Sequence, residues 1–255
     1  MISRGDIIAV DDLAWRFAVS QETIRRDIRA LEQAGLLRRV HGGAAPTGPV
    51  NLTARRPVAE RLTMGREAKA EAARAALPLF EDGMNVFLGG SSTMLLLAEA
   101  LQRRDLALTV TTSMIDIATA LAGGRCKVTL LGGVVNAATH TLTGPEMLAG
   151  LERRLFDLAV CGASAVDLSH GFLGPSEWHT AIGATLATRS RRLAFVCDAS
   201  KLGRSDAHVV QALEAVEALA TDQAPPPEFA AALDSAGVAV LLPDAPAAAD
   251  RQDAL

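Results

Sequence analysis

Short apolar runs alternate with segments of helical periodicity along most of the chain after residue 57. Seven of these runs have the length of β-strands: 84–88, 107–112, 126–131, 158–162, 193–198, 216–222 and 238–242. Helical segments are expected at 59–77, 92–101, 113–122 and 177–191. Because continuous apolar strands separated by helices are typical of a parallel sheet covered on both faces, the pattern predicts a Rossmann-like α/β domain over residues 58–243.

The first 45 residues carry a different pattern, with two short helices. Residues 10–17 are predicted to form a helix whose apolar face carries Val10, Leu13, Ala14 and Phe17. Ser20 is a suitable N-cap for a second helix over 21–34, because its hydroxyl can accept a hydrogen bond from an orphan backbone N–H. The apolar positions of that helix, which are expected to face inward, are Ile24, Ile28 and Leu31.

The residues after the second helix predict a wing. Gly35 ends the helix, residues 36–40 form a short strand, and His41-Gly42-Gly43 is a tight turn. A helix-turn-helix followed by a basic two-stranded hairpin is a winged helix, so residues 1–45 are expected to bind DNA. Residues 46–57 carry three prolines and are expected to be a linker, whereas the low-complexity residues 244–255 are expected to be a disordered tail.

Polar side chains near the start of the second helix, followed by arginines, suit a recognition helix. The polar groups can reach base edges, and arginines bind guanine edges or phosphates. The expected DNA contacts are Ser20, Gln21, Thr23, Arg25, Arg26 and Arg29 from the helix, and Arg38, Arg39, His41 and Gly42 from the wing. Taken singly, these residues have ordinary explanations, because arginines usually form a solvated helix face and His41 beside two glycines suits a turn.

The distribution of charge supports the expectation that this segment binds DNA. The whole chain has a formal net charge of −4, yet residues 23–41 hold five arginines against two acidic residues. A local basic patch on an acidic chain indicates that one segment has its own anionic partner. The composition, with 49% hydrophobic and 21% charged residues, is that of a folded protein.

The same composition excludes several classes of protein. No apolar stretch approaches the roughly 20 residues of a membrane helix, and the first residues lack the layout of a signal peptide, so a cytoplasmic protein without a membrane partner is expected. The three cysteines, Cys126, Cys161 and Cys197, argue against a disulfide framework. Their spacing with histidine does not suggest zinc, and we expect neither a metal nor another cofactor.

Three turns that follow predicted strands, together with one lysine, form a candidate ligand site. Ligands of open parallel sheets bind outside the carboxyl ends of the strands, where glycines admit the ligand, hydroxyls donate, and helix N-termini favour anions. The expected contacts are Gly89, Gly90, Ser91, Ser92, Thr93, Thr111, Thr112, Ser113, Gly132, Gly133 and Lys201. Any single turn is more simply an ordinary connector, and Asp198 is best explained as a structural partner of Lys201 or of a turn amide.

The N-terminal segment resembles the DeoR family of bacterial transcriptional regulators. The matching residues are Val19, Ser20, Thr23, Ile24, Arg25, Arg26, Asp27, Ile28 and Leu31, then Arg39, His41, Gly42, Gly43 and Ala44. The resemblance implies that Thr23, Arg25 and Arg26 lie on the recognition helix. It continues through Glu60-Arg61, Lys69, 88–93, 110–113, 131–133, Gly144, 156–159 and 198–203. That part is similar to a sensor domain with the fold of ribose-5-phosphate isomerase and glucosamine-6-phosphate deaminase, which implies a phosphorylated sugar or related metabolite as effector.

The sequence departs from the family pattern in two places. Family members have a full helix before the position of Gly5, where only four residues stand here, and we expect that the start was assigned too late. The family motif E-A-x-x-K-R is replaced by a segment in which Trp178 and His179 follow Glu177. These two side chains could contact a sugar, or Trp178 could belong to the core, and a non-phosphorylated polyol or sugar acid stays open as the effector.

Taken together, these features predict a DNA-binding regulator, a repressor of a carbohydrate-utilisation operon that leaves double-stranded operator DNA when a sugar phosphate or related metabolite binds. Homo-oligomers are expected, because helix-turn-helix proteins read paired half-sites. The alternative is an isomerase-like or deaminase-like enzyme using Asp116, Glu146, Glu177 or His179, but none of these stands in a catalytic motif, so no catalytic residue is expected. A third alternative is an interaction module that does not bind DNA.

Overall fold

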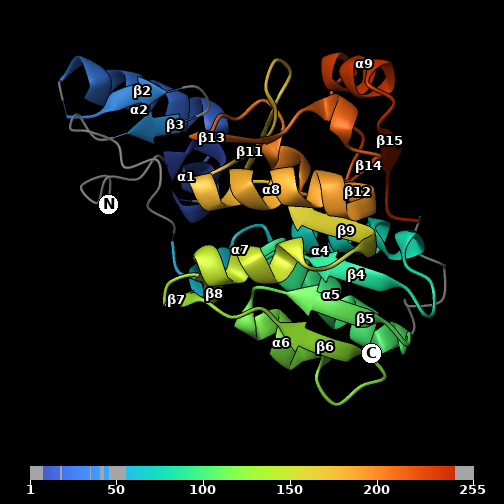
Figure 1. The fold of residues 1–255 in the computed structure, drawn as a ribbon. Helices are drawn as coiled ribbons and strands as arrows, with labels where there is room; N and C mark the ends of the chain where they lie inside the picture. Colours follow the sequence, from blue (N-terminus) through green and yellow to red (C-terminus); the bar gives the residue numbers. More distant parts are fainter. Residues whose placement is uncertain (1–7, 18, 35, 41–42, 46–55, 245–255) are drawn as a thin grey trace, which may run out of the picture. The chain divides into compact units, whose positions relative to one another are not determined.

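The structure is a computed structural model that describes residues 8–17, 19–34, 36–40, 43–45 and 56–244. The chain separates into two compact units, Met1–Arg55 and Arg56–Leu255, which are described separately. Figure 1 shows the order of their elements along the chain. Each described helix is too short or too polar to cross a membrane.

The N-terminal unit is a winged helix-turn-helix. Helices α1 (Val10–Phe17) and α2 (Gln21–Gln33) pack on a three-stranded antiparallel sheet in the order β1-β3-β2, built from Ile8–Ala9, Gly43–Ala45 and Arg38–Val40. Their buried side chains form one small core, made of Val10, Leu13, Ile24, Ile28, Leu37 and Ala44. The helix limits agree with those expected from the apolar spacing.

Two inward-facing residues of this unit were predicted wrongly. Leu31 shares a helix face with Ile24 and Ile28 but is 40% exposed, so the buried stripe of α2 ends at Ile28. Phe17, the last residue of α1, is 58% exposed. The small core is closed without them, because a helix of two turns presents only Val10, Leu13 and Ala14 to its neighbours.

The larger unit is built on a seven-stranded sheet in which every pair of neighbours is parallel. In spatial order the strands are β15 (Ala239–Leu241), β14 (Ala218–Ala220), β12 (Ser190–Val196), β9 (Phe156–Gly162), β4 (Asn85–Leu88), β5 (Thr109–Thr112) and β6 (Lys127–Leu130). All seven predicted strands are present, and the Rossmann-like parallel sheet is confirmed. The order reverses at β4, the first strand of this sheet along the chain, whose neighbours are β5 and β9.

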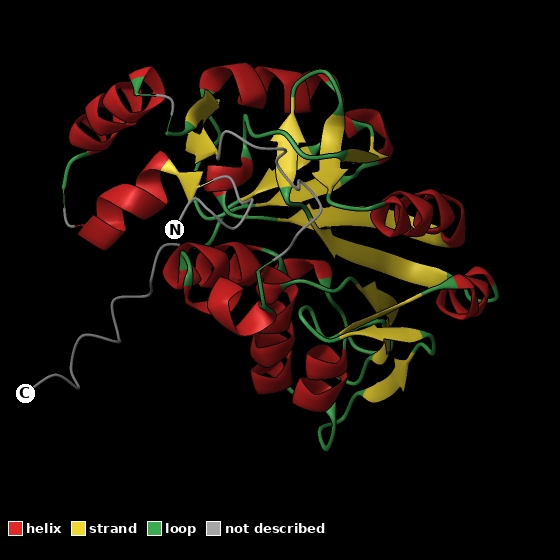
Figure 2. Cartoon of the chain, turned by 90° about the vertical axis from the view of Figure 1, so that its left-hand side faces the viewer, coloured by secondary structure: helices red, strands yellow, loops and turns green. Residues whose placement is uncertain are grey.

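Helices cover both faces of this sheet, as Figure 2 shows. They are α3 (Val58–Thr63), α4 (Arg66–Ala75), α5 (Ser92–Arg104), α6 (Ile115–Leu121), α7 (Pro145–Glu152), α8 (Glu177–Arg189) and α9 (Pro227–Ser235). Adjacent residues of one strand belong to different cores: Val86 and Leu88 pack with α4, α5 and α6, whereas Phe87 packs with α7 and α8. This alternation explains why the strands are apolar throughout.

The single helix expected over 59–77 is two helices. Gly65 has a φ of +55°, which breaks the helix between α3 and α4. The last residues, Leu77–Leu79, form a separate 3-10 helix, η2, before the chain enters β4. The apolar spacing continues across the break, so periodicity alone did not reveal it.

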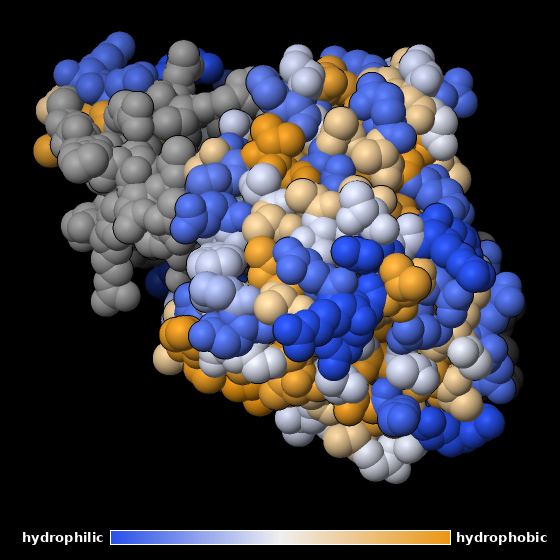
Figure 3. Space-filling view, in the orientation of Figure 1, coloured by the Kyte–Doolittle hydropathy of each residue, from blue (hydrophilic) through white to orange (hydrophobic). Residues whose placement is uncertain are grey.

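Two small antiparallel sheets were not predicted. One is the hairpin of β7 (Val134–Asn136) and β8 (Thr141–Thr143), and the other contains β10 (Ala165–Asp167), β11 (Gly171–Gly174) and β13 (His208–Gln211). On the face in Figure 3, apolar side chains gather along the lower edge, where Figure 1 places β7, β8 and α6. Val134 and Val135 are more than half exposed in this hairpin.

Candidate functional site

Helix α2 presents a polar, basic surface on the side opposite its core. Ile24 and Ile28 are buried, whereas Gln21, Arg25, Arg26 and Arg29 are exposed. At about 100° per residue, Arg26 lies almost opposite the buried pair. A helix with this division can place its outer face in a DNA major groove while its inner face stays in the core.

Hydrogen bonds fix the side chains at the start of α2. The Ser20 hydroxyl caps the helix by accepting from the Thr23 backbone N–H at 3.2 Å, and it lies 2.9 Å from the Thr23 hydroxyl. Arg25 donates to the Gln21 amide oxygen at 3.4 Å. Arg26 and Arg29 form no ion pair within the described residues, so their guanidinium groups are available to phosphates.

Backbone pairing between β2 and β3 forms the wing. Arg38, Arg39 and Val40 pair with Ala45, Ala44 and Gly43, which makes β2 and β3 a hairpin directly after the recognition helix. His41 and Gly42, both expected to contact DNA, lie outside the described residues, as do Gly35 and most of the linker and tail.

The turns expected to bind the effector all lie at one edge of the seven-stranded sheet. Because the strands are parallel, their carboxyl ends meet there. Residues 89–93 follow β4, 111–113 end β5, 132–133 follow β6, and Lys201 lies in the 3-10 helix η3 (Ala199–Lys201) after β12. We call this side the carboxyl edge.

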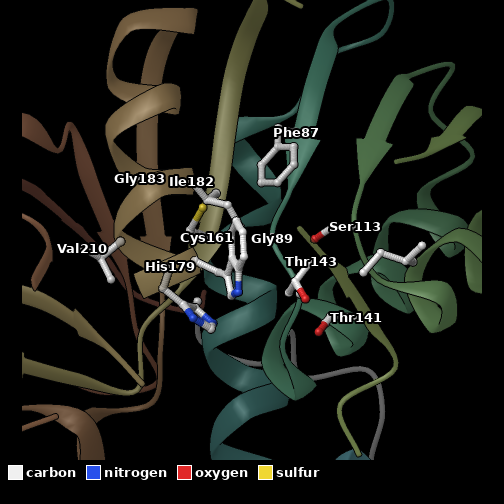
Figure 4. Close-up of a pocket in the computed structure, with 14 residues that line it drawn as sticks. Phe87, Gly89, Ser113, Thr141, Thr143, Cys161, His179, Ile182, Gly183 and Val210 are labelled. Carbon is white, nitrogen blue, oxygen red and sulfur yellow. The ribbon is translucent and has the colours of Figure 1, made fainter. Parts of the chain in front are cut away.

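A cavity of about 560 Å³, its open mouth included, lies at the carboxyl edge between β4, β5 and β9. Its walls are formed by Phe87, Gly89, Gly90, Ser113, Thr141, Leu142, Thr143, Cys161, Gly162, Trp178, His179, Ile182, Gly183 and Val210. Figure 4 shows the hydroxyls of Ser113, Thr141 and Thr143 on one side and Cys161, Ile182, His179 and Val210 on the other.

The cavity wall is amphipathic and carries no carboxylate, lysine or arginine among the described residues that form it. Burial raises the pKa of the Cys161 thiol to about 12, so this group is a neutral wall atom. Gly90 lets the backbone after β4 pack directly against Thr141, because a Cβ at Gly90 would lie 2.6 Å from the Thr141 methyl group. Hydroxyls facing apolar and aromatic groups suit a ligand that has hydroxyls on its edge and an apolar face.

Two family models match most of the chain. The DeoR-like helix-turn-helix domain matches residues 1–47, and the DeoR C terminal sensor domain matches residues 65–223. The chain belongs to the DeoR family. The HTH-type transcriptional regulator GlpR of Haloferax volcanii is 30% identical over 241 residues, covering 94% of this chain and 93% of that protein.

Other relatives of this DeoR-family protein are also named as regulators. The glycerol-3-phosphate regulon repressor of Escherichia coli strain K12 is 28% identical over 229 residues, covering 89% of this chain and 88% of that protein. Ribose 5-phosphate isomerase A from Methanocaldococcus jannaschii has a TM-score of 0.40 and 19% identity, over 54% of this chain and 55% of that chain, a likeness too remote to support a shared activity. The DeoR-family chain is a DNA-binding transcription regulator and not an enzyme.

Only some of the expected effector residues line the cavity of this DeoR-family regulator. Gly89, Gly90 and Ser113 do. Ser91 instead caps α5, because its hydroxyl accepts from the Met94 N–H at 3.1 Å. The Thr112 hydroxyl likewise accepts from the Met114 N–H at 3.2 Å. The side chains of Ser92, Thr93 and Thr111 are buried.

The remaining expected residues lie elsewhere along the carboxyl edge. Gly132 and Gly133 do not line the cavity, and a Cβ on Gly133 would lie 2.5 Å from the Thr143 carbonyl oxygen, which indicates a packing role. The Lys201 ammonium is 4.0 Å from a carboxylate oxygen of Asp198, as the structural interpretation of Asp198 predicts. The other Asp198 oxygen accepts from the Ser200 hydroxyl.

Several cavity residues were missed from the sequence. Thr141 and Thr143 come from the unpredicted strand β8, and Gly162 ends β9. The alternating Thr-Leu-Thr of β8 was the available signal, since it places two hydroxyls on one face. Trp178 and His179 both line the cavity from the first turn of α8, and His179 Nδ1 lies 2.8 Å from the Ser176 hydroxyl.

Proposed function

We propose that this regulator represses a carbohydrate-utilisation operon and leaves its operator when a sugar-type metabolite fills the cavity at the carboxyl edge. The names of the relatives, which include a glycerol-3-phosphate regulon repressor, support the direction of regulation and the class of operon. The observation that carries the effector half is the cavity itself, with three hydroxyls facing a largely apolar wall.

The DNA half of the proposal rests on α2 and the hairpin after it. Thr23, Arg25 and Arg26 are the residues that we assign to base edges and nearby phosphates, with Arg29 on the backbone. Arg38 and Arg39 are assigned to the flanking backbone, together with His41 and Gly42 of the wing turn. A dimer would match two half-sites of a palindromic operator.

In the effector half, Trp178 supplies an aromatic surface for the apolar face of a sugar ring. Ser113, Thr141 and Thr143 supply hydroxyls that can donate to or accept from the ring hydroxyls. The glycine-lined entrance lets the ligand approach the backbone of β4. The effector releases DNA only if it binds the free form of the protein more tightly than the DNA-bound form.

An electrophoretic shift on the gene's own upstream region tests the DNA half. We expect a specific complex whose affinity falls steeply with salt. The double variant Arg26→Gln/Arg29→Gln should bind weakly and lower the salt slope by about 0.9 for each phosphate that it no longer neutralises. Arg103→Gln, an exposed arginine on α5, is the matched control. A wild-type complex that is insensitive to salt would contradict the proposal.

Thermal unfolding in the presence of sugars, polyols and sugar phosphates tests the effector half. A ligand at about 100 times its dissociation constant adds roughly 2.7 kcal/mol of stability. The same compound should dissociate the operator complex. Trp178→Ala should lose the ligand response and keep operator binding. A ligand that stabilises the wild type and Trp178→Ala equally would place the effector outside this cavity.

A further inference from the structure

Strand β6 is the last strand of the seven-stranded sheet, and its outer edge is open. Within the described residues, β5 is the one strand that pairs with it. Lys127 and Leu131 donate their N–H groups to carbonyls on the β5 side, at 2.8 and 2.9 Å. Because the backbone groups of a strand alternate between its two edges, those of Val128 and Leu130 point away from β5. Such outward groups are a template for pairing with another strand.

Strand β6 carries few of the devices that protect an edge from pairing. Protected edges contain proline, several charges or a bulge. β6 reads Lys-Val-Thr-Leu, in which Lys127 is the one charged residue, and its register with β5 is regular. Leu130, at the carboxyl end of the strand, is 40% exposed. This edge is therefore suited to pairing with a further strand.

The exposed apolar surface continues from β6 into the hairpin of β7 and β8. Val134, which follows Leu130 by four residues, is 67% exposed, and Val135 is 54% exposed. In Figure 1, β6 is the lowest labelled strand of the sheet, and Figure 3 shows apolar side chains gathered along this lower edge. We call the open edge of β6 together with Leu130, Val134 and Val135 the β6 face. Exposed apolar residues beside an open strand edge mark an interaction site.

The open edge of β6 is complementary to itself. If a two-fold axis passes through Thr129, the β6 strands of two copies run antiparallel, and Val128 of each copy lies opposite Leu130 of the other. These residues can then exchange both backbone hydrogen bonds, because both point their N–H and carbonyl groups outward. Since Val128 and Leu130 are two residues apart, their side chains lie on one face of the sheet. Each Val128 therefore also packs on Leu130 of the second copy.

Charges on the opposite face of the sheet support the same arrangement. Lys127 shares that face with Leu131, which packs against α7. A Cβ at Gly144 would lie 3.2 Å from Glu146 Oε2 and 3.9 Å from Val134 Cγ2, so the Glu146 carboxylate lies beside the hairpin that follows β6. Lys127 and Glu146 are both exposed and form no ion pair within the described residues. Antiparallel pairing brings Lys127 of one copy toward Glu146 of the other.

We propose that the β6 face is the interface between two copies of this chain, with the two β6 strands paired antiparallel in one continuous sheet. A stable dimer buries about 800 Å² on each partner, more than a strand of four residues supplies, so Val134 and Val135 belong to the interface. Because β7 pairs with β8, whose Thr141 and Thr143 line the cavity, one hairpin belongs to both sites. The dimer that reads paired half-sites is thereby given a surface, whichever effector fills the cavity.

Cysteine cross-linking of the full chain tests the position of the axis. The two copies of Thr129 face each other there as a non-hydrogen-bonded pair with Cα atoms about 4.5 Å apart, which suits a disulfide. In a Cys126→Ser background, whose other cysteines are buried, oxidised Thr129→Cys should run as a covalent dimer on a non-reducing gel. Lys127→Cys is the matched control, because its two copies would lie about 13 Å apart and should not cross-link.

Sedimentation velocity at micromolar concentration measures the strength of the dimer. Leu130→Pro removes an N–H that points away from β5, so it should raise the dissociation constant at least roughly tenfold and keep the hydrogen bonds within the sheet. Val134→Lys should weaken the dimer as well, because it places a charge in the apolar contact. Leu155→Lys changes a residue of the same 67% exposure outside the β6 face and should dimerise as the wild type does.

Exchange of the two charges tests the contact on the other face. Lys127→Glu and Glu146→Lys should each weaken the dimer, and their combination should restore it, because the pair is re-formed with its charges reversed. Failure of the combination to recover any affinity would contradict the proposed register.

The oligomeric state also separates this inference from the proposed function. A monomeric wild type, or folded Val134→Lys and Leu130→Pro proteins that dimerise as tightly as the wild type, would overturn the β6 interface. So would a Thr129→Cys protein that dimerises without cross-linking. A wild type that dimerises through the β6 face but does not bind its own upstream region would reject the proposed function alone.

Discussion

The three cysteines occupy three environments that decide their chemistry. Cys161 faces the cavity, Cys197 directly follows the neighbouring strand β12, and both are buried. Burial raises the pKa of Cys161 to about 12 and raises that of Cys197 as well, since a thiolate loses hydration there. Cys126 is half-buried, with its thiol 3.4 Å from the Leu106 carbonyl. These surroundings give the buried pair a packing role rather than a reactive one.

A thiol titration of the native protein with a disulfide reagent at pH 8 checks this difference. At that pH the raised pKa keeps the buried Cys161 a neutral thiol, so only Cys126 should react within minutes. All three thiols should react after denaturation. Cys126→Ser is the control, and rapid labelling of that variant in its native state would contradict the burial argument.

Gly183 lies where α8 packs tightly against β13. A Cβ at this position would lie 2.6 Å from the Val210 carbonyl oxygen and 2.8 Å from a Val210 methyl group. Gly183→Ala should therefore force α8 away from the strand and destabilise the sensor unit by about 1–3 kcal/mol. Urea unfolding measures the loss. Ala184→Ser on the exposed side of the same helix should change stability little, and a Gly183→Ala protein as stable as the wild type would show that α8 can shift freely.

Among single residues, sequence alone predicts those whose role is set by local geometry. The Ser20 cap and the buried pair Ile24 and Ile28 were predicted, because capping and helical spacing are local properties. The exposure of Leu31 and the wall position of Trp178 depend on what packs nearby in space. Neither property can be predicted from the residues next to it in the sequence.

At the scale of elements, the Ser20 cap stabilises the first turn of the recognition helix α2. Ser20→Ala removes the hydroxyl that accepts from the Thr23 N–H and should cost about 1 kcal/mol of helix stability. Because Thr23 and Arg26 lie in the first two turns, operator affinity should fall with it. Circular dichroism and the DNA shift measure the two effects. Ser20→Asp keeps an accepting oxygen, and its failure to preserve the fold would argue against a capping role.

Element prediction succeeded where a strand was apolar and failed where polar residues or glycine interrupted it. The central strands β4, β5, β9, β12 and β14 were found because they are largely buried between helices and therefore mostly apolar. The strands of the two antiparallel sheets have three or four residues each and include polar residues or glycine, so that no apolar run marks them. The break at Gly65 was missed because a positive φ leaves the apolar spacing on either side unchanged.

At the scale of the whole molecule, the sequence could predict that the expected turns meet at the carboxyl edge, but it could not predict the walls of the cavity there. Gly89, Gly90 and Ser113 follow strands in the chain, and parallel topology alone brings them together. Thr141, Thr143 and His179 arrive from β8 and α8, whose position over the edge depends on tertiary packing.

The division of the chain into two units predicts that the larger one is independent. Both of its hydrophobic cores draw all their buried residues from the interval between Val58 and Val238. A fragment of residues 56–244 should therefore unfold cooperatively and keep the ligand response of the full chain, while losing operator binding. Calorimetry and the DNA shift check this, with the full chain as control. A fragment without a cooperative transition would mean that the sensor unit needs residues before 56.

The break at Gly65 has a mechanical consequence. It makes α3 a separate helix of six residues, the first helix of the sensor unit. The Lys69 ammonium of α4 bridges the break, because it donates to the carbonyls of Arg61 and Met64. Moving α3 alone would cost this buried lysine both hydrogen bonds, so α3 should move together with α4.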